Sequence, residues 1–233
     1  MTDKRTEFIL IKAGITNVYL FSNGEKSVLV DTGSKGSANH ILDQIRKSGL
    51  KPSDICLIIL THTHFDHSGN LKILVDKTGA KVLVHKKEAT CLSLGFTVIP
   101  KGAFFYTKFL SWAGRKLFTT IGHYLPVIPD IIVDDKFDLS VFGLDGYLLP
   151  LPGHTDGSLT LIIGHQAFVG DNMVGMIPGR VFPAFVNDIP LLMESWKLLI
   201  DSGCTAFYPG HGKMVSIDQL KSAFKKQSRK RRL

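Results

Sequence analysis

The chain has 233 residues, of which 44% are hydrophobic and 21% charged, with 22 glycines and 10 prolines. This composition is typical of a globular protein and excludes a disordered or collagen-like chain. The formal net charge is +8, but seven of the 28 basic residues lie between Lys221 and Arg232, where there is no acidic residue. The rest of the chain is therefore nearly neutral, and the excess of positive charge belongs to its C-terminal end.

No low-complexity linker and no internal repeat divides the sequence. We predict a single domain over residues 1–220, with residues 87–147 as an aromatic-rich insertion, followed by a basic tail over residues 221–233. A terminal basic run of this kind is typical of a solvated, frayed chain end, and nucleic acid or anionic lipid is the alternative partner.

The three cysteines are an odd number without a pairing pattern, which argues against a disulfide scaffold. The N-terminal residues lack the features of a signal peptide, and no apolar run approaches the length of a transmembrane segment. We therefore expect a cytoplasmic protein without a transmembrane segment, and the oligomeric state stays open.

Strand and helix signals alternate along the chain. The first part has three β-rich runs separated by turn residues, then a helical pattern and a buried strand, and the second part repeats the alternation. We expect strands near residues 8–11, 18–21, 27–30, 55–60, 81–85, 147–149, 159–163, 167–169 and 206–208, and helices over 37–50, 71–78, 190–202 and after Ser216. Glycine- and histidine-rich segments follow the strand ends, which predicts a layered α/β domain with its chemistry on loops along one edge.

Four candidate metal ligands lie within six residues, directly after the buried strand 55–60. In an extended segment, residues two apart point the same way, so His62 and His64 are placed to bind one ion. Asp66 and His67 follow where the chain turns into a helix, and they are placed to bind a second ion. Imidazole and carboxylate together suit zinc, with iron or manganese as alternatives.

Later strand ends supply the further donors that two metal sites need. His154 lies in a turn bounded by glycines, Asp171 comes just after a strand, and His211 lies between Gly210 and Gly212. Glycine permits backbone shapes that aim such a side chain inward. Five of the nine histidines thus share one kind of strand-end context. The other four lack this context, and we expect them to be structural or exposed: His40, His85, His123 and His165.

Together these residues resemble the metal-binding signature of the metallo-β-lactamase-fold hydrolases, and are similar to the branch of glyoxalase II and the lactonases, with the subfamily left unassigned. The segment from Val30 to Gly33, with Asp31, is similar to a further motif of that superfamily. The resemblance implies a four-layer αββα sandwich with a dinuclear site along one edge. It also implies that Asp31 supports the site and that the ligands divide as follows: His62, His64 and His154 on the first metal, Asp66, His67 and His211 on the second, and Asp171 as the bridge.

Two metal ions about 3.5 to 4 Å apart can hold a hydroxide between them at neutral pH. We therefore expect this hydroxide to be the nucleophile, with one metal polarising the oxygen of the scissile group. Asp66 is the expected catalytic residue, because it is placed to orient the hydroxide and to return a proton to the leaving group. No serine or cysteine nucleophile is needed.

The leading hypothesis is hydrolysis of a small ester, thioester or lactone. Glyoxalase II has a C-terminal helical domain that helps bind glutathione, whereas this sequence ends 22 residues after His211, so we do not expect the glyoxalase II substrate. Asn172 follows Asp171 close to where the lactonases usually place a tyrosine, so lactonase activity is not specifically supported. A phosphodiesterase or nuclease-like activity, assisted by the basic tail, is the first alternative. A di-iron redox module is the second.

Aromatic residues are concentrated between residues 103 and 124, which hold seven of the 22 aromatic residues of the chain. If this segment is helical, Phe105, Phe109 and Trp112 share one face. A face of this kind is typical of a helix that packs on the core, which is the favoured interpretation, and an apolar wall over the metal site is the alternative. The loop over residues 173–186, with Arg180, follows a ligand and is expected to border the pocket.

Overall fold

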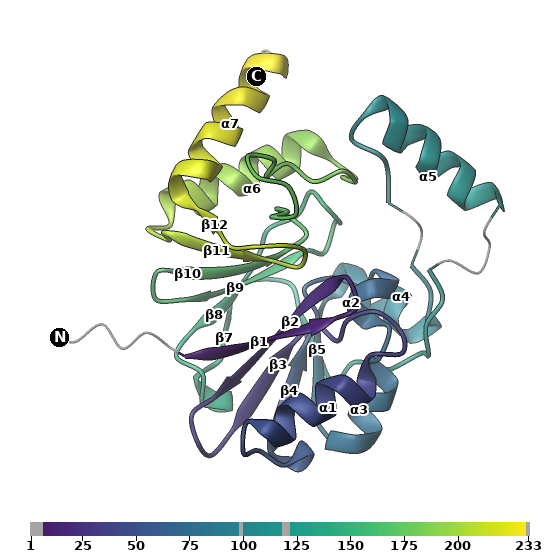
Figure 1. Ribbon diagram of the computed structural model, residues 1–233, viewed down its shortest axis with the longest axis vertical. Coiled ribbons are helices and arrows are strands. Elements are labelled where there is room, and N and C mark those ends of the chain that lie inside the picture. The colour runs from purple at the N-terminus through teal and green to yellow at the C-terminus, as the bar shows by residue number, and fades with distance from the viewer. Residues whose placement is uncertain (1–6, 98–99, 118–121, 232–233) are drawn as a thin grey trace.

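The computed structural model describes residues 7–97, 100–117 and 122–231. Two six-stranded sheets pack face to face, with helices on both outer faces (Figure 1). The αββα sandwich that the resemblance implies is thereby confirmed. No helix among the described residues is long and apolar enough to cross a membrane.

The first sheet has the strand order β1 to β6. Its first three strands are antiparallel, and the rest of the sheet is parallel. Parallel neighbours need crossover connections, and α1 and α3 provide two of them on the outer face. The strands are β1 (Phe8–Ala13), β2 (Thr16–Ser22), β3 (Ser27–Val30), β4 (Ile55–Ile59), β5 (Lys81–His85) and β6 (Ile131–Val133), and the helices of this half are α1 (Ala38–Lys47), α2 (Phe65–Ser68), α3 (Leu71–Thr78), α4 (Lys86–Leu94) and α5 (Phe105–Leu117).

The second sheet has the order β12, β11, β10, β9, β8, β7. It is antiparallel except for β10 and β11, which are parallel and are joined through α6. Its strands are β7 (Phe137–Asp138), β8 (Tyr147–Pro150), β9 (Leu159–Ile163), β10 (Gln166–Gly170), β11 (Ala206–Pro209) and β12 (Val215–Ser216), and its helices are α6 (Ile189–Asp201) and α7 (Ile217–Arg231). In Figure 1, α6 and α7 cover this sheet, while α1 and α3 cover the other.

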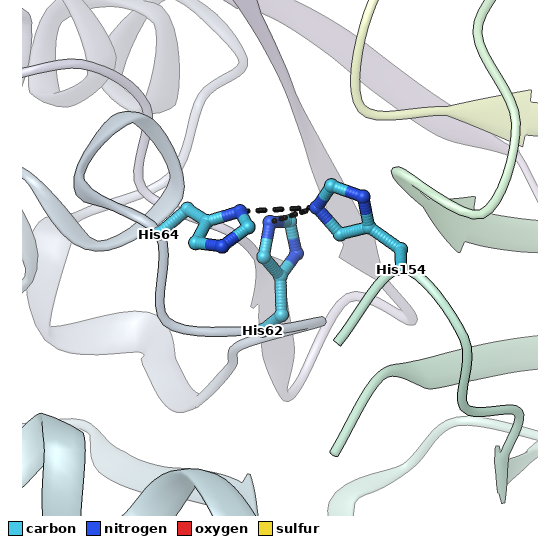
Figure 2. A group of neighbouring side chains, drawn as sticks. All are labelled: His62, His64 and His154. Carbon is cyan, nitrogen blue, oxygen red and sulfur yellow. Dashed lines mark hydrogen bonds between the residues drawn. The ribbon is translucent and has the colours of Figure 1, made fainter. Parts of the chain in front are cut away.

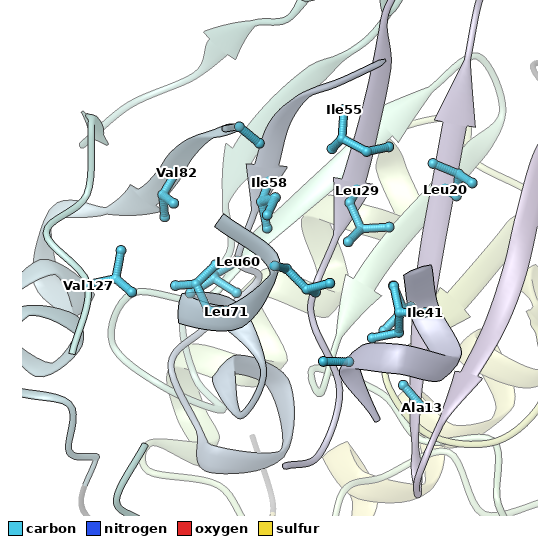
Figure 3. Packing of buried hydrophobic residues seen from close by; sticks show 14 of the residues in the cluster. Ala13, Leu20, Leu29, Ile41, Ile55, Ile58, Leu60, Leu71, Val82 and Val127 are labelled. Carbon is cyan, nitrogen blue, oxygen red and sulfur yellow. The ribbon is translucent and has the colours of Figure 1, made fainter. Parts of the chain in front are cut away.

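Alternation along the strands divides the interior into three apolar layers. Val28 and Val30 of β3 face the other sheet, whereas Leu29 between them faces the helices. The outer layer of the first sheet includes Leu20, Ile41, Ile58, Leu71 and Val82 (Figure 3). The layer between the sheets includes Phe21, Ile59, Leu148, Leu161 and Phe168. The layer under α6 and α7 includes Val169, Trp196, Leu199, Phe207 and Leu220.

The expected strands and helices are all present, with ends shifted by a few residues. Five further elements were not predicted from the sequence, because they are short or lie within the range 87–147: α2, α4, β6, β7 and β12. Residues 131–133 and 137–138 of the range 87–147 are strands of the two sheets. The basic segment continues α7 as far as Arg231 instead of fraying, because Leu220 and Phe224 pack against the core.

The site lies where the loops after several strands meet. The loops after β3, β4, β10 and β11 and the turn between β8 and β9 come together at one edge of the sandwich, as the backbone hydrogen bonds between them show. Asp31 N donates to Ile59 O at 2.8 Å, Leu159 N donates to Thr61 O at 2.8 Å, and Gly210 N donates to Gly170 O at 2.7 Å. Loops from both sheets therefore build one surface.

Candidate metal centre

Asp31 anchors the loop that follows β4. Its backbone has a φ of 63°, a conformation that no other non-glycine residue adopts among those the structure describes. Its carboxylate accepts hydrogen bonds from Thr61 N at 2.8 Å and from Thr61 Oγ1 at 2.9 Å. It also accepts one from His67 Nδ1 at 2.8 Å. One buried carboxylate thus fixes the loop at two points, in agreement with the supporting role that the resemblance implies.

Three histidine rings converge in front of this loop. His62 and His64 come from the loop itself, and His154 comes from the turn between β8 and β9 (Figure 2). His154 Nε2 lies 3.2 Å from His62 Nε2 and 3.0 Å from His64 Nδ1. All three side chains are buried. Their ring nitrogens therefore point at one common position.

In His62 and His154, the ring nitrogen that points away from the common position, Nδ1, has a hydrogen-bond acceptor. His154 Nδ1 donates to Phe185 O at 3.0 Å, and His62 Nδ1 lies 3.1 Å from Thr61 Oγ1, whose own proton goes to Asp31. Both tautomers therefore leave Nε2 with a lone pair directed at the common position. Burial lowers the pKa of His62 and His154, and it lowers the pKa of His64 to about 3. The three rings are consequently neutral at physiological pH.

A second group, which consists of Asp66, His67 and His211, lies beside the first. His211 Nε2 is 3.1 Å from Asp66 Oδ2 and 3.2 Å from Asp171 Oδ2. His67 Nε2 is 3.3 Å from Asp171 Oδ1. His154 Nε2, of the first group, is 3.8 Å from Asp171 Oδ2. Asp171 therefore stands between the two groups.

The second group is held by charge as well as by hydrogen bonds. Burial would lower the pKa of His211, but Asp171 and Asp66 outweigh it and raise this pKa to about 10. Asp31 and Asp171 likewise raise the pKa of His67 against the effect of burial. The two protonated rings in turn outweigh burial and keep the pKa of Asp171 well below its usual range. Without a metal ion, protons on His67 and His211 balance the buried carboxylates.

The donors suit divalent metal ions. Three sets of ligand atoms each lie within 4.8 Å of one another: His62, His64 and His154, then His62, His67 and Asp171, then Asp66, His67 and His211. His67 Nε2 and Asp171 Oδ1 lie 3.3 Å from each other, and both are buried without a hydrogen bond to any residue that the structure describes. A Cβ atom on Gly210 would lie 2.5 Å from Asp171 Oδ1, so only glycine leaves room for these donors. Unpaired buried donors of these types are what a metal site requires.

Glycine serves two purposes around the site. Gly153 has a φ of +137° and Gly212 a φ of +90°, so the expected role in shaping the backbone holds for both. Gly210 has no positive φ, and the space beside Asp171 explains its presence instead. The expectation of a special backbone shape was therefore wrong for Gly210.

All seven predicted ligands come together at this edge, four from the first sheet and three from the second. The other four histidines lie outside both groups. His40, His123 and His165 are exposed, and the buried His85 accepts a hydrogen bond from Lys87 N at the start of α4.

Sequence reasoning missed two buried residues that hold the site loops. Glu88 Oε2 accepts hydrogen bonds from Thr63 N at 3.1 Å and from Thr63 Oγ1. Asn17 Nδ2 donates to Pro209 O at 2.8 Å and to Gly212 O at 3.0 Å, on either side of His211. Neither has a recognisable signal, since a glutamate in the first turn of a helix and an asparagine near a hairpin turn are both common.

The aromatic face of α5 does not pack on the core, which was the favoured interpretation of the sequence. Phe105, Phe109 and Trp112 share one face of α5, but their side chains are 90%, 61% and 55% exposed, so the core-facing interpretation was wrong for these three. Phe118, which belongs to the same aromatic segment, lies outside the described residues. The loop after Asp171 does border the site, because Gly175 N donates to His211 O at 2.8 Å and Phe185 O holds His154. Arg180 is exposed on this loop.

An αββα sandwich with histidine and aspartate clusters at one edge defines a class of metal-dependent hydrolases. The sequence model of a protein family, described as the metallo-beta-lactamase superfamily, matches residues 11–211 of this chain. The chain belongs to that superfamily.

Individual relatives agree with this membership. The chain is 29% identical over 203 residues to a probable metallo-hydrolase of Methanocaldococcus jannaschii, a match that covers 85% of this chain and 88% of the relative. It is 26% identical to an acyl-coenzyme A thioesterase of Gallus gallus, over 88% of this chain and 75% of the relative. Four further curated relatives are longer, and the chain spans 50% to 59% of their length.

The fold also has solved counterparts. An archaeal metallo-beta-lactamase superfamily protein from Sulfolobus tokodaii superimposes with a TM-score of 0.69 at 24% sequence identity. The superposition covers 95% of this chain and 86% of that protein. At this level of identity the likeness bears on the fold alone.

Proposed function

We propose that this protein is a dinuclear metal-dependent hydrolase that cleaves a small ester, thioester or lactone. The observation that carries the proposal is the position of Asp171 between two three-residue donor groups. In this proposal His62, His64 and His154 bind one divalent ion, Asp66, His67 and His211 bind the other, and Asp171 contacts both. Zinc is the proposed metal, because neutral imidazole is its usual nitrogen ligand in proteins and carboxylate its usual oxygen ligand.

The protein supplies orientation, and the bound ions would supply Lewis-acid chemistry, which lowers the pKa of water and polarises a carbonyl oxygen. Asp66 and Asp171 are the most accessible ligands, with side chains 13% exposed, while the histidines behind them are more deeply buried. Substrate therefore reaches the centre from the side of these two carboxylates. Burial would raise the pKa of Asp66, but His67 and His211 outweigh it and keep this pKa below its usual value, so the residue is ionised. In this proposal its carboxylate orients the attacking water and returns a proton to the leaving group.

The similarity to an acyl-coenzyme A thioesterase supports the thioester as the first substrate class to test. The exposed basic residues of α7, such as Lys225 and Lys226, are the feature that favours a phosphodiester instead. A cytoplasmic location is also part of the proposal, and it is supported by the three cysteines, all of which are free thiols.

Metal analysis and hydrolysis of a substrate panel test the proposal together. We expect about two zinc ions per chain after purification without chelator, and zinc-dependent turnover of thioesters or lactones. Asp171→Ala should lower the metal content and abolish turnover, whereas the exposed His40→Ala should change neither. Failure to bind metal after reconstitution would contradict the proposed metal centre. Activity confined to phosphodiesters would overturn the substrate class, and two irons with redox-active absorption would overturn the hydrolytic reaction.

A further inference from the structure

Among the side chains of helix α5 that the structure describes, polar ones are buried and aromatic ones are exposed, the reverse of a helix that packs on a core. Thr107 and Ser111 are buried, and their hydroxyl groups donate to Phe104 O at 3.0 Å and to Pro100 O at 2.6 Å. Phe105 and Phe109 lie on the opposite side, Trp112 lies at the edge of that face next to the cavity that Ser111 also lines, and all three are largely exposed. A water-facing row of aromatic residues is costly for a monomer and marks a contact surface.

Further exposed apolar side chains lie on the described segments before and after α5. Leu94, Leu125 and Ile128 are also exposed, and the segments that carry them are joined, since Tyr124 N donates to Gly95 O at 2.9 Å and Val127 N donates to Leu92 O at 3.2 Å. Six of the 17 large exposed apolar residues that the structure describes therefore lie between residues 94 and 128. In Figure 1 this part of the chain lies along one side of the molecule, with α5 projecting beside the sandwich.

The charge of the same stretch has one sign. Between Glu88 and Asp130 the sequence has no acidic residue, and its charged residues are Lys101, Lys108, Arg115 and Lys116. Lys101 and Lys108 are exposed and line a cavity of about 720 Å³ between α5 and the start of α6, together with Trp112. The acidic residue of that cavity, Asp188, accepts a hydrogen bond from Leu191 N and so caps α6.

Exposed aromatic residues beside basic residues are the composition of a helix that lies in a membrane interface. The rings enter the boundary of the acyl chains, and the ammonium groups meet anionic headgroups. A second copy of the chain fits less well, because a two-fold contact would bring the same positive surface against itself. We propose that α5, with Lys101 and Lys108, binds this protein to anionic lipid membranes.

The surface is connected to the metal centre. Val186 N donates to Lys101 O at 2.8 Å, and Ala103 N donates to Ala184 O at 2.9 Å, so the segment before α5 pairs with the loop after Asp171. Phe185, in the middle of that loop, provides the carbonyl that orients His154. A membrane on α5 would therefore lie beside the catalytic edge. The membrane contact itself does not depend on the proposed reaction.

Vesicle binding of the full chain tests the proposal. The probes are phosphatidylcholine vesicles with and without 30% phosphatidylglycerol, at low and at high salt. We expect at least about tenfold stronger co-sedimentation with the anionic vesicles, weakened by salt. Trp112 gives a second readout, because the chain has two tryptophans and Trp196 is fully buried. Its emission should shift to shorter wavelength on the anionic vesicles, and Trp112→Phe should remove that shift.

Matched variants distinguish vesicle binding through α5 from nonspecific vesicle binding by other exposed residues. The double variant Phe105→Ser with Phe109→Ser should lower binding about tenfold, whereas Leu198→Ser, at an exposed leucine of α6, should not. Lys108→Glu should weaken binding, whereas Lys77→Glu, at an exposed lysine of α3, should have little effect. Unchanged thermal unfolding of each variant shows that the fold is intact.

Several results would overturn the proposal. Equal binding to neutral vesicles, or undiminished binding of the Phe105 and Phe109 double variant, would show that this surface is not responsible. Loss of binding on Lys225→Glu with Lys226→Glu alone would assign the contact to α7. A dimer in light scattering that the double variant converts to a monomer, with no vesicle binding, would show that the aromatic face joins two copies. Binding to an acidic protein but to no vesicle would identify a protein partner.

Discussion

Glu88 is a buried carboxylate that the proposed reaction does not use. It accepts hydrogen bonds from the backbone nitrogen and the hydroxyl of Thr63, the residue between His62 and His64. Thr97 Oγ1 donates to Thr63 O at 2.5 Å from the other side. The backbone at Thr63 is thus held at both its N–H and its carbonyl, so the spacing of the two flanking imidazoles depends on these contacts.

Replacing Glu88 should therefore weaken both the fold and the centre. Glu88→Ala leaves the Thr63 N–H and hydroxyl without this acceptor, which should lower the free energy of unfolding by about 1 to 3 kcal/mol. Because the loop between His62 and His64 then loosens, zinc affinity should fall about tenfold or more. Urea unfolding and zinc competition with a chromogenic chelator measure the two effects.

Two further variants make this result interpretable. Glu194→Ala removes an exposed glutamate of α6 and should change neither quantity. Thr63→Val removes only the hydroxyl donor and should give an intermediate loss of zinc affinity. If Glu88→Ala lowers stability but leaves zinc affinity intact, Glu88 supports the fold without positioning the ligands.

At the level of single residues, the sequence predicts the candidate metal ligands better than the residues that hold their loops in place. The candidate ligands could be chosen because histidine and aspartate at glycine-bounded strand ends have few other uses. Glu88 and Asn17 could not, because their partners lie 25 and 192 residues away. Asp31 was found only through the resemblance, since its positive φ and its bond to His67 are properties of the folded chain.

Among the elements, the hairpin of β1 and β2 positions a loop of the other sheet. Its turn provides Ile15 O, which accepts from His211 Nδ1 at 2.8 Å. Asn17 N donates to Gly210 O at 2.7 Å, and the Asn17 side chain donates to the carbonyls of Pro209 and Gly212. The hairpin thus holds the His211 loop from the first sheet.

Asn17→Ala should disturb the second donor group more than the first. Two carbonyls beside His211 lose a donor, while the hydrogen bond of His154 to Phe185 is untouched. We expect the metal content to fall from about two ions toward one per chain, with a lower free energy of unfolding by about 1 to 3 kcal/mol. Metal analysis after dialysis at a fixed free zinc concentration measures the first effect.

Asn23→Ala is the matched control, because Asn23 donates from the next hairpin to Gly143 O at an exposed position. It should keep both ions. Equal loss of both ions from Asn17→Ala would contradict separate support of the two donor groups.

The elements also show where periodicity stops being informative. Helical spacing correctly places Phe105, Phe109 and Trp112 on one face, but it does not say which face of α5 is buried. The hydrophobic rule selects the aromatic face, whereas the buried side has Thr107 and Ser111, whose hydroxyls find acceptors close by. Strand β6 has only three residues and pairs with β5 across a long connection, so no local pattern identifies it.

At the scale of the whole molecule, the centre joins the two sheets. The loop after β4 contributes His62, His64, Asp66 and His67, and the second sheet contributes the remaining three candidate ligands. A metal bound by these residues would tie together two halves that otherwise meet through an apolar layer. Its binding free energy should appear as stability of the whole fold.

The stability of the metal-free protein should depend on pH in both directions. The pKa of His211 is raised to about 10, so its contribution is complete below the unfolded value of about 6.5 and is lost as the pH rises toward 10. The pKa of His64 is lowered to about 3, so the unfolded chain takes up the proton first and stability falls below about pH 6.5. Urea unfolding of chelator-treated protein from pH 5 to 10 should therefore show a maximum near pH 6.5.

The alkaline side of this profile reports the charge balance of the second donor group. Each such proton changes the stability by at most about 1.4 kcal/mol per pH unit. His211→Gln should flatten the alkaline side and leave the acid side in place, because it removes one raised pKa and no lowered one. Zinc should also flatten the alkaline side, since the ion replaces the protons of His67 and His211. An alkaline slope that persists in both cases would show that these protons do not stabilise the metal-free fold.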